Sequence, residues 1–323
     1  MEKEDLRIVY MGTPEFAVES LRALVENGYH VVGVVTMPDK PAGRGHKLQS
    51  SPVKQYAEEK GLFLMQPDRL KDEAFLSKLK SLRADLQIVV AFRMLPEVVW
   101  SMPRYGTINL HGSLLPQYRG AAPINWAIIN GEKETGVTTF FLKHEIDTGN
   151  IIMQDRTVIT PEDDLGSVYD RLMKTGADLV VKTVESIRKG EVQETPQPMS
   201  GDLRPAPKIY KSTCQLDFNR TVTDLHNLVR GLSPYPAAWT LLEMPDGQRN
   251  TLKVYRTSVE TLVPQEAPGT LVSDGKKTLK VACRNGYLHL EELQIAGKRR
   301  MSARDLLCGF NPEGVSIIKE KMD

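Results

Sequence analysis

Short apolar runs that alternate with amphipathic stretches constrain the fold of this chain more than any other feature. In the first 110 residues the runs are predicted strands, at Leu6–Met11, Val31–Met37, Leu62–Met65, Leu86–Ala91 and Thr107–Leu110. Between them, Thr13-Pro14 predicts a helix with Thr13 as N-cap and Gly28 past its end, and Ser51-Pro52 with Gly61 repeats the pattern. Strands separated by helices predict an α/β fold with a doubly wound, mostly parallel sheet.

The pattern changes after Gly131. Val137–Leu142 and Asn150–Ile159 are predicted strands joined by a short polar connection, which is typical of a hairpin. A long amphipathic helix is predicted over Leu165–Arg188. The stretch Glu194–Lys211 contains four prolines and few large apolar side chains, so it is the predicted linker.

Beyond the linker, a helix is predicted over Thr221–Leu232. Short apolar runs follow, separated by turn signals at Asp246-Gly247, Asp274-Gly275 and Asn285-Gly286. Such strands predict a small, OB-like β-barrel, with a β-sandwich as the alternative. Because 323 residues with 41% apolar content suffice for two cores, we predict a first domain over residues 1–205 and a C-terminal β-barrel domain over residues 206–323.

Composition excludes several classes of protein. A formal net charge of +1 argues against a chain that binds polyanions over its whole surface. The three cysteines lie far apart with no C-x-x-C pair, so neither a disulfide framework nor a zinc site is predicted, and no metal is expected. No apolar run approaches the roughly 20 residues that span a bilayer. We expect a cytoplasmic monomer without membrane contact.

Asn109 and His111 are the strongest candidates for chemistry. In an extended chain they project from one face of the strand, at the carboxyl edge where open α/β sheets bind ligands. Asp147, in the polar connection between two strands, is the candidate third member, because a carboxylate beside an imidazole favours its protonated form and fixes its orientation. Taken singly, each residue also has an ordinary interpretation: Asp147 as a turn residue, His111 as a polar strand end and Asn109 as a backbone cap.

Taken with its surroundings, this set resembles the folate-dependent formyltransferase family. The resemblance lies in Asn109-x-His111-Gly-Ser-Leu-Leu-Pro116, followed about thirty residues later by Asp147-Thr-Gly. Four further segments support it and extend it over nearly the whole chain: Gly12–Ala17, Asp39–Gly45, Tyr118–Pro123 and Leu232–Trp239. Gly12–Ala17 lacks G-x-G-x-x-G, so a dinucleotide site is disfavoured.

The resemblance implies that 10-formyltetrahydrofolate is the formyl donor and that the α-amino group of methionyl initiator tRNA is the acceptor. It places the catalytic trio on Asn109, His111 and Asp147. The Asn109 amide and a protonated His111 would stabilise the oxyanion that forms on the carbonyl, and losing one such donor costs on the order of 3 kcal/mol. Asp147 would take the proton of the attacking amine, directly or through a water, and His111 would protonate the departing nitrogen.

The resemblance also implies a pterin pocket built largely from backbone on the strand and loop before the Asn109 strand. The folate-binding residues expected are Ala91, Phe92, Met94, Leu95, Ser113, Leu114, Leu115 and Pro116. The chain departs from the family here, because Arg93 occupies the region where members commonly have a glycine, in a shorter loop.

Two cationic regions are expected to hold the tRNA. The arm Met37–Leu48 carries Lys40 and Arg44, and in the resembled family a matching arginine enters the tRNA acceptor end, so Arg44 is expected to sense an unpaired first base pair. The second domain offers basic clusters for the RNA backbone at Lys276, Lys277, Lys280, Lys298, Arg299, Arg300 and Arg304. The alternatives are a solvated loop and lysines that only aid solubility. Phe16 and Tyr169 are the expected residues of a methionine pocket.

Rival functions remain at this stage. A formyltransferase acting on a small amine, such as a nucleotide sugar or glycinamide ribonucleotide, or a formyltetrahydrofolate hydrolase would share the trio, but the cationic arm and the second domain argue against them. A non-catalytic RNA-binding relative would keep the scaffold, but the intact trio argues against it.

Overall fold

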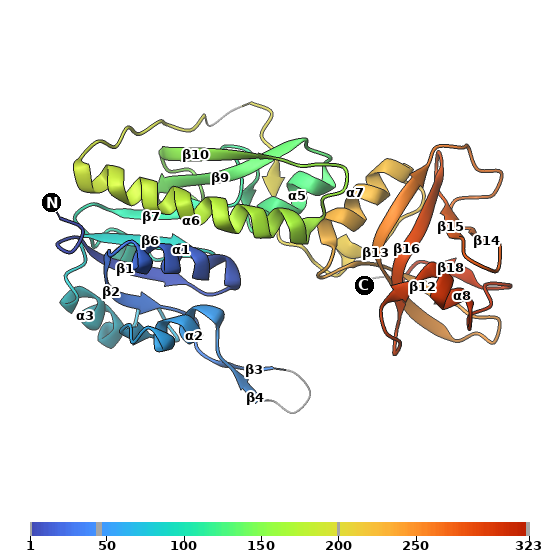
Figure 1. Ribbon diagram of the computed structural model, residues 1–323, viewed down its shortest axis with the longest axis horizontal. Coiled ribbons are helices and arrows are strands. Elements are labelled where there is room, and N and C mark those ends of the chain that lie inside the picture. Colours follow the sequence, from blue (N-terminus) through green and yellow to red (C-terminus); the bar gives the residue numbers. More distant parts are fainter. Residues whose placement is uncertain (1, 43–46, 199–200, 321–323) are drawn as a thin grey trace. The chain divides into compact units, whose positions relative to one another are not determined.

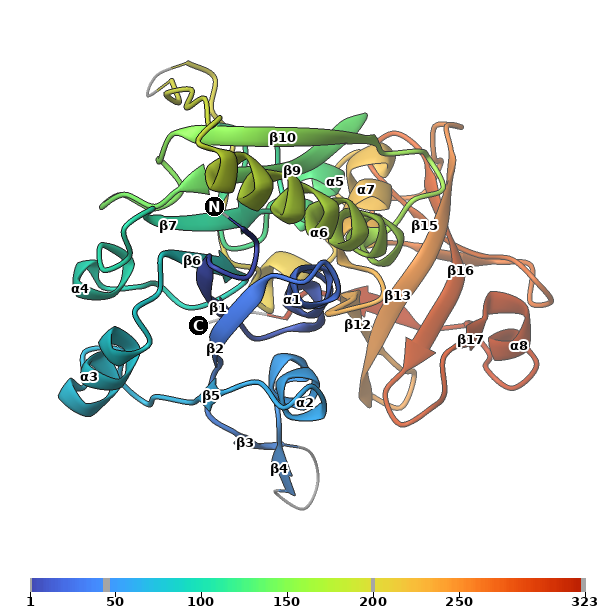
Figure 2. The same cartoon turned by 60° about the vertical axis from the view of Figure 1, so that its left-hand side comes forward.

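The computed structural model describes residues 2–42, 47–198 and 201–320, and the chain divides into two compact units (Figures 1 and 2). The first unit comprises the residues up to 123, 135–157 and 169–205. The second comprises residues 124–134, 158–168 and those from 206 onward. The two short internal segments thus group with the C-terminal part of the chain, a detail that the predicted ranges 1–205 and 206–323 do not contain.

In the first unit, seven of the described strands form one sheet in the order β10-β9-β7-β6-β1-β2-β5. Strand β1 pairs in parallel with β2 and β6, β2 pairs in parallel with β5, β6 pairs in parallel with β7, and β9 runs antiparallel to β7. The predicted doubly wound, mostly parallel sheet is therefore confirmed. The strands are β1 (Arg7–Gly12), β2 (His30–Val35), β5 (Leu64–Met65), β6 (Leu86–Val90), β7 (Thr107–His111), β9 (Glu134–Phe141) and β10 (Ile151–Val158).

Helices cover both faces of this sheet. Helices α1 (Glu15–Glu26) and α6 (Leu165–Lys189) lie side by side in both views (Figures 1 and 2), and the Tyr10 hydroxyl of β1 donates to the Ala17 carbonyl of α1 at 2.5 Å. Val9 and Met11 alternate with Tyr10 along β1, so they face the other side, where α3 (Glu73–Ser81) and α4 (Glu97–Trp100) share their apolar cluster. The remaining elements of this region are β3 (Lys40–Ala42), β4 (Lys47–Gln49), α2 (Pro52–Glu59), β8 (Arg119–Gly120) and β11 (Pro205–Ala206).

The helix starts follow the predicted capping pattern in one case and not in the other. Ser51 caps α2, because its hydroxyl accepts the Lys54 N–H at 3.1 Å. Helix α1 has Pro14 at the N-cap position, and its first turn gains no side-chain cap. The prediction of Thr13 as N-cap is wrong because the helix begins one residue later, which leaves the Thr13 hydroxyl buried without a hydrogen bond among the described residues.

In the second unit, the described strands form an antiparallel, nearly closed barrel-like sheet in the order β14-β15-β16-β13-β12-β18, with β17 paired to β16. This confirms the predicted C-terminal barrel. Helix α7 (Val222–Leu232) is capped by Thr221, whose hydroxyl accepts the Asp224 N–H at 3.2 Å. The other elements are α5 (Pro123–Ile129), the 3-10 turn Ser212–Cys214, β12 (Ala238–Glu243), β13 (Arg249–Glu260), β14 (Leu271–Ser273), β15 (Leu279–Ala282), β16 (Tyr287–Ile295), β17 (Met301–Ser302), α8 (Ala303–Leu307) and β18 (Ser316–Ile318).

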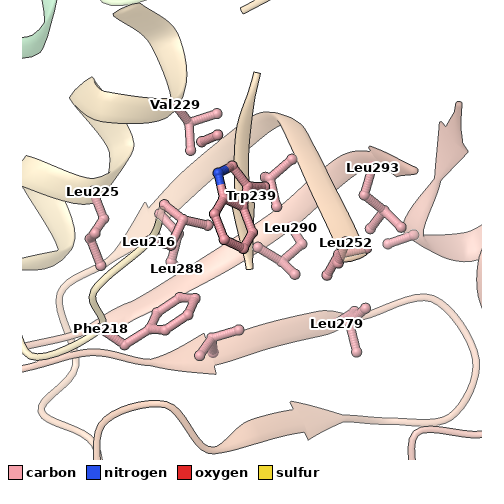
Figure 3. Close-up of a cluster of buried hydrophobic side chains, with 14 of the residues drawn as sticks. Leu216, Phe218, Leu225, Val229, Trp239, Leu252, Leu279, Leu288, Leu290 and Leu293 are labelled. Carbon is pink, nitrogen blue, oxygen red and sulfur yellow. The ribbon is translucent and has the colours of Figure 1, made fainter. Parts of the chain in front are cut away.

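The core of the barrel forms around Trp239, which is 4% exposed (Figure 3). Leu225 and Val229 of α7 and Leu288 and Leu290 of β16 belong to the same buried cluster. The indole Nε1 donates to the Lys211 carbonyl at 3.0 Å, so burial leaves no unpaired polar atom on this side chain. None of the helices in the described part of the chain is both long and apolar enough to cross a membrane.

Candidate active site

The carboxyl ends of β1, β6 and β7 meet at one edge of the first unit's sheet. Gly12 at the end of β1 is level with Val90 at the end of β6, and Val90 is level with Leu110 of β7. The chain passes from β1 to β2 on one side, whereas β6 and β7 lie on the other, so the topology switches direction between β1 and β6. Open α/β sheets bind ligands at such a point.

His111 ends β7 and is 7% exposed. Its Nε2 lies 2.8 Å from the carbonyl oxygen of Tyr118. A carbonyl only accepts hydrogen bonds, so Nε2 carries a proton and donates it to this bond. The nitrogen left to exchange protons is therefore Nδ1.

Asp147 lies against that second nitrogen. Its Oδ2 is 3.8 Å from His111 Nδ1, and the Asp147 side chain is 9% exposed. This distance is longer than a hydrogen bond but short enough for a direct charge interaction when the imidazole is protonated. The same oxygen accepts the Gly120 N–H at 3.0 Å, which fixes the carboxylate from a second direction.

The backbone around Asp147 is tightly constrained. Asp147 has a φ of 55°, in the left-handed region that few side chains adopt. Two residues later, a Cβ on Gly149 would lie 1.5 Å from the Phe141 carbonyl oxygen, so only glycine fits there. The aspartate is thus carried on a connection whose shape its neighbours determine.

Asn109 precedes His111 by two residues on β7 and is half-buried. Its side-chain amide has no hydrogen-bond partner among the residues that the structure describes. The structure thus places His111 beside Asp147, and on the strand that carries His111 it leaves an amide donor without a partner among the described residues.

The turn that follows His111 is held by the strands beside it. Thr138 of β9 donates its hydroxyl to the Ser113 carbonyl at 2.6 Å and accepts the Leu115 N–H at 3.1 Å. Gln154 of β10 donates to the Leu115 carbonyl at 2.9 Å. Ser113 and Leu115 are buried, whereas Leu114 and Pro116 are half-buried. Of the predicted folate residues in this turn, the latter two are therefore the more accessible.

The loop after β6 is shaped by the arginine that departs from the family pattern. The Arg93 guanidinium donates to the carbonyls of Pro67 and Asp68, the latter at 2.8 Å, and lies 5.6 Å from the Phe92 ring. Its burial lowers the pKa of Arg93. Met94 is 71% exposed, and Leu95 is buried. In the described chain, the N–H groups of residues 92–95 donate to no backbone carbonyl.

A groove runs beside this loop. Its apolar lining includes Leu70, Leu76, Met94 and Val98, and Arg69 and Lys71 add positive charge. Asp68 and Glu97 also line the groove, so its walls carry charges of both signs. In the described residues, no group of three or more His, Cys, Asp or Glu side chains could hold a metal ion.

The structure describes the predicted methionine pocket fully but the predicted cationic arm only in part. Phe16 and Tyr169 contact each other edge to face, with ring centroids 5.3 Å apart, and the Tyr169 hydroxyl accepts the Phe16 N–H at 2.9 Å. Lys40 is exposed at the start of β3, whereas Arg44 lies outside the described residues.

The predicted basic clusters of the second unit are partly neutralised. Arg300 donates to Glu292 at 2.7 Å and lies 4.2 Å from the Tyr255 ring, and Lys280 Nζ is 2.9 Å from a Glu260 oxygen. Within the described chain, no ion pair involves Lys298 or Arg299. Of the consecutive residues Lys298, Arg299 and Arg300, the first two therefore carry a positive charge that no carboxylate in the described chain neutralises.

Sequence reasoning missed Gln197, which lies in the predicted linker. Its amide donates to the backbone carbonyls of Asp147 and Gly149 at 2.9 and 2.7 Å. A polar residue between prolines in a linker gave no signal, because the contact spans 50 residues.

This fold and this polar edge define a class of enzyme. Residues 6–184 match the family described as Formyl transferase, and residues 208–311 match Formyl transferase, C-terminal domain. The chain belongs to the formyl transferase family, and it is a formyl-transferring enzyme.

The names of its relatives are more specific than the family description. The chain is 60% identical over 315 residues, 96% of this chain and 97% of the relative, to a Parabacteroides distasonis protein named Methionyl-tRNA formyltransferase. A Bacteroides fragilis protein of the same name is 58% identical over 314 residues, again 96% and 97% of the two chains.

Solved structures share the fold at lower identity. An N-formyltransferase from Helicobacter canadensis, in complex with folinic acid and dTDP-3-aminofucose, has a TM-score of 0.64 at 19% identity, covering 90% of this chain and 99% of that one. HypX from Aquifex aeolicus, in complex with tetrahydrofolic acid, has a TM-score of 0.62 at 17% identity, covering 95% and 48%.

Proposed function

We propose that this enzyme transfers the formyl group of 10-formyltetrahydrofolate to the α-amino group of methionyl initiator tRNA, which prepares the tRNA for translation initiation. One observation carries the proposal. Identity of 58–60% to relatives named Methionyl-tRNA formyltransferase extends over 96% of the chain, so it includes the barrel as well as the formyl transferase domain.

The bound folate supplies the formyl carbon, and we assign the other tasks to the edge of the first unit. The Asn109 amide, without a partner in the described residues, is available to donate a hydrogen bond to the carbonyl oxygen as negative charge develops there. Such donors act strongly because they are already in place before the reaction.

Proton transfer falls to the pair beside it. Nε2 of His111 is occupied by the Tyr118 carbonyl, so its proton exchange takes place at Nδ1, 3.8 Å from the Asp147 carboxylate. Asp147 accepts the proton that the attacking amine loses, and protonated His111 supplies one to the departing nitrogen. Free α-amino groups titrate at about pH 8, so part of the amine is already neutral near pH 7, and the enzyme needs to give little help in removing the proton.

The loop after β6 suits the folate. Its N–H groups from Phe92 to Leu95, which donate to no backbone carbonyl in the described chain, can recognise the pterin edge. The adjacent groove, which Arg69 and Lys71 help to line, can hold the ring and the carboxylates of the donor. We also assign the turn from Ser113 to Pro116 to the folate site. No step of the proposed chemistry requires a metal.

For the tRNA, we propose that Arg44 and Lys40 engage the acceptor end and that Lys298, Arg299 and Arg300 contact the backbone. Phe16 and Tyr169 remain the proposed wall of the methionine pocket, since their rings contact each other at the start of α1. We further propose a cytoplasmic monomer that meets folate and tRNA in solution.

The experiment compares acceptors with purified enzyme and 10-formyltetrahydrofolate. We expect formylation of methionyl initiator tRNA, none of the same tRNA with an acetylated amino group, and at least about 1,000-fold lower kcat/KM with a nucleotide amino sugar. Efficient transfer to the sugar with none to tRNA would establish the small-amine alternative instead. RNA binding without any transfer would indicate a non-catalytic relative.

A further inference from the structure

Gln197 occupies an unusual position between the linker and the catalytic edge. Its side chain is buried, although it lies between two prolines in a segment with little regular structure. Its Nε2 donates to the backbone carbonyls of Asp147 and Gly149, at 2.9 and 2.7 Å. Its Oε1 accepts from Nε and Nη2 of Arg119, at 3.1 and 2.7 Å.

Every hydrogen-bonding position of this amide is used. A glutamine amide offers two N–H donors and two acceptor sites, and Gln197 places both donors on carbonyls and both acceptor sites on a guanidinium. Arg119 can only donate, so it fixes which end of the amide faces it. The NH2 end must then face the Asp147 connection.

The segment Tyr118–Gly120 reaches the catalytic pair in three ways. The Tyr118 carbonyl accepts from His111 Nε2, the Gly120 N–H donates to the Asp147 carboxylate, and the Arg119 side chain orients Gln197. Gln197 in turn holds the main chain of Asp147. The backbone and the carboxylate of this aspartate are thus anchored to one short segment, which also anchors the imidazole.

We propose that Gln197 is a positioning residue for formyl transfer, which sets the distance between Asp147 and His111 by holding the Asp147–Gly149 main chain against Arg119. Asp147 needs such support because its φ of 55° is unfavourable for an aspartate and no regular element carries it. The inference rests on the proposed function, since Gln197 acts through Asp147. A displacement of about 1 Å can lower a rate about 100-fold.

A double-mutant cycle tests this inference. Single-turnover formyl transfer to methionyl-tRNA is measured for wild type, Gln197→Ala, Asp147→Ala and the double variant. We expect Gln197→Ala to lower the rate about 10- to 100-fold while the Kd values for folate and tRNA stay within about twofold. In the Asp147→Ala background, Gln197→Ala is expected to change the rate by less than about twofold, because its effect passes through Asp147.

A second variant keeps the test informative if Gln197→Ala folds poorly. Gln197→Glu retains two acceptor positions for Arg119 but has no donor for the carbonyls of Asp147 and Gly149. We expect at least the same loss of rate in a folded protein. The matched control is Gln117→Glu, because Gln117 also reaches the linker, donating to the Asp202 carbonyl at 2.9 Å, but its side chain makes no described contact with Asp147. Its rate should stay within about threefold of wild type.

The outcomes separate the two proposals. Losses of Gln197→Ala and Asp147→Ala that multiply in the double variant, or a wild-type rate for Gln197→Glu, would overturn the positioning role. A wild-type rate for Asp147→Ala would instead overturn the assignment of Asp147 itself, whatever Gln197 does.

Discussion

The proposed catalytic edge of the first unit and the proposed RNA-binding surface of the second unit are built in different ways. At the edge, His111 and Asp147 are nearly buried, and backbone groups of Tyr118 and Gly120 hold them. On the barrel, Arg300 and Lys280 are held by the carboxylates of neighbouring side chains, and all four side chains are partly exposed. Backbone groups are held by the fold itself, whereas long side chains can change rotamer.

The difference matches the two tasks. Formyl transfer develops negative charge on one carbonyl oxygen, and the groups that stabilise this charge must be in position before the reaction begins. Attraction of an RNA backbone requires net positive charge over an area, which tolerates movement of each cation. If the two regions serve these separate tasks, substitutions should change the stability of the barrel, the rate of formyl transfer and the attraction of tRNA independently of one another.

The largest expected effect concerns the core that supports the basic surface. Trp239→Ala should destabilise the second unit by about 3–5 kcal/mol, because a nearly fully buried indole leaves a cavity. Calorimetry should resolve this as one transition at lower temperature, with the first unit's transition unchanged. A loss below about 1 kcal/mol would mean that the barrel does not depend on this cluster.

The next effect concerns the catalytic edge. Asn109→Ala should lower turnover about 100-fold or more, because it removes a preorganised donor, and it should leave tRNA affinity nearly unchanged. Steady-state kinetics with methionyl-tRNA and filter binding measure the two quantities. Equal losses in turnover and affinity would show that Asn109 binds rather than stabilises charge.

A smaller effect is expected for attraction of the tRNA. Replacing Lys298 and Arg299 by alanine should reduce the slope of log KM against log salt by about one to two, with kcat preserved. The control replaces Arg256 and Glu291 together by glutamine, which removes a paired charge without changing the net charge. Identical slopes for the two variants would contradict a role for unpaired cations.

The smallest effect concerns acid stability. Arg188 and Tyr29 bond Glu185 and lower the pKa of its carboxyl to about 2. A pKa below the unfolded value stabilises the fold above about pH 4 and ceases to do so as the pH falls toward 2. Glu185→Gln should therefore lose less stability than wild type between pH 5 and 2, as measured by urea midpoints. Exposed Glu191→Gln is the control, and an unchanged acid profile in Glu185→Gln would be inconsistent with this coupling.

Much of the fold could be predicted because its elements are locally encoded. The run from Leu86 and the run from Thr107 become β6 and β7 within a residue of their predicted bounds, since apolar content and length suffice to define a buried strand. The direction of β9, antiparallel to β7, carries no local signal. The Thr13 prediction was wrong because either Thr13 or Pro14 can precede the first turn, and only the packed structure decides.

The candidate site was predictable only in part. The i, i+2 spacing of Asn109 and His111 indicates a shared face, but the approach of Asp147 depends on a strand and a connection about 30 residues away. Gln197 and the carbonyls that it holds were beyond prediction, because backbone contacts depend on main-chain course and leave no residue pattern. The bonds of Arg93 to the carbonyls of Pro67 and Asp68 are likewise visible only in three dimensions.

The coupling between His111 and Asp147 tests the central claim most directly. Single-turnover formyl transfer is measured for His111→Ala, Asp147→Ala and the double variant, with methionyl-tRNA and folate saturating. If the two side chains act as one pair, either single change lowers the rate nearly as far as both together. Losses that multiply in the double variant would show that the two residues act independently, and would contradict this account.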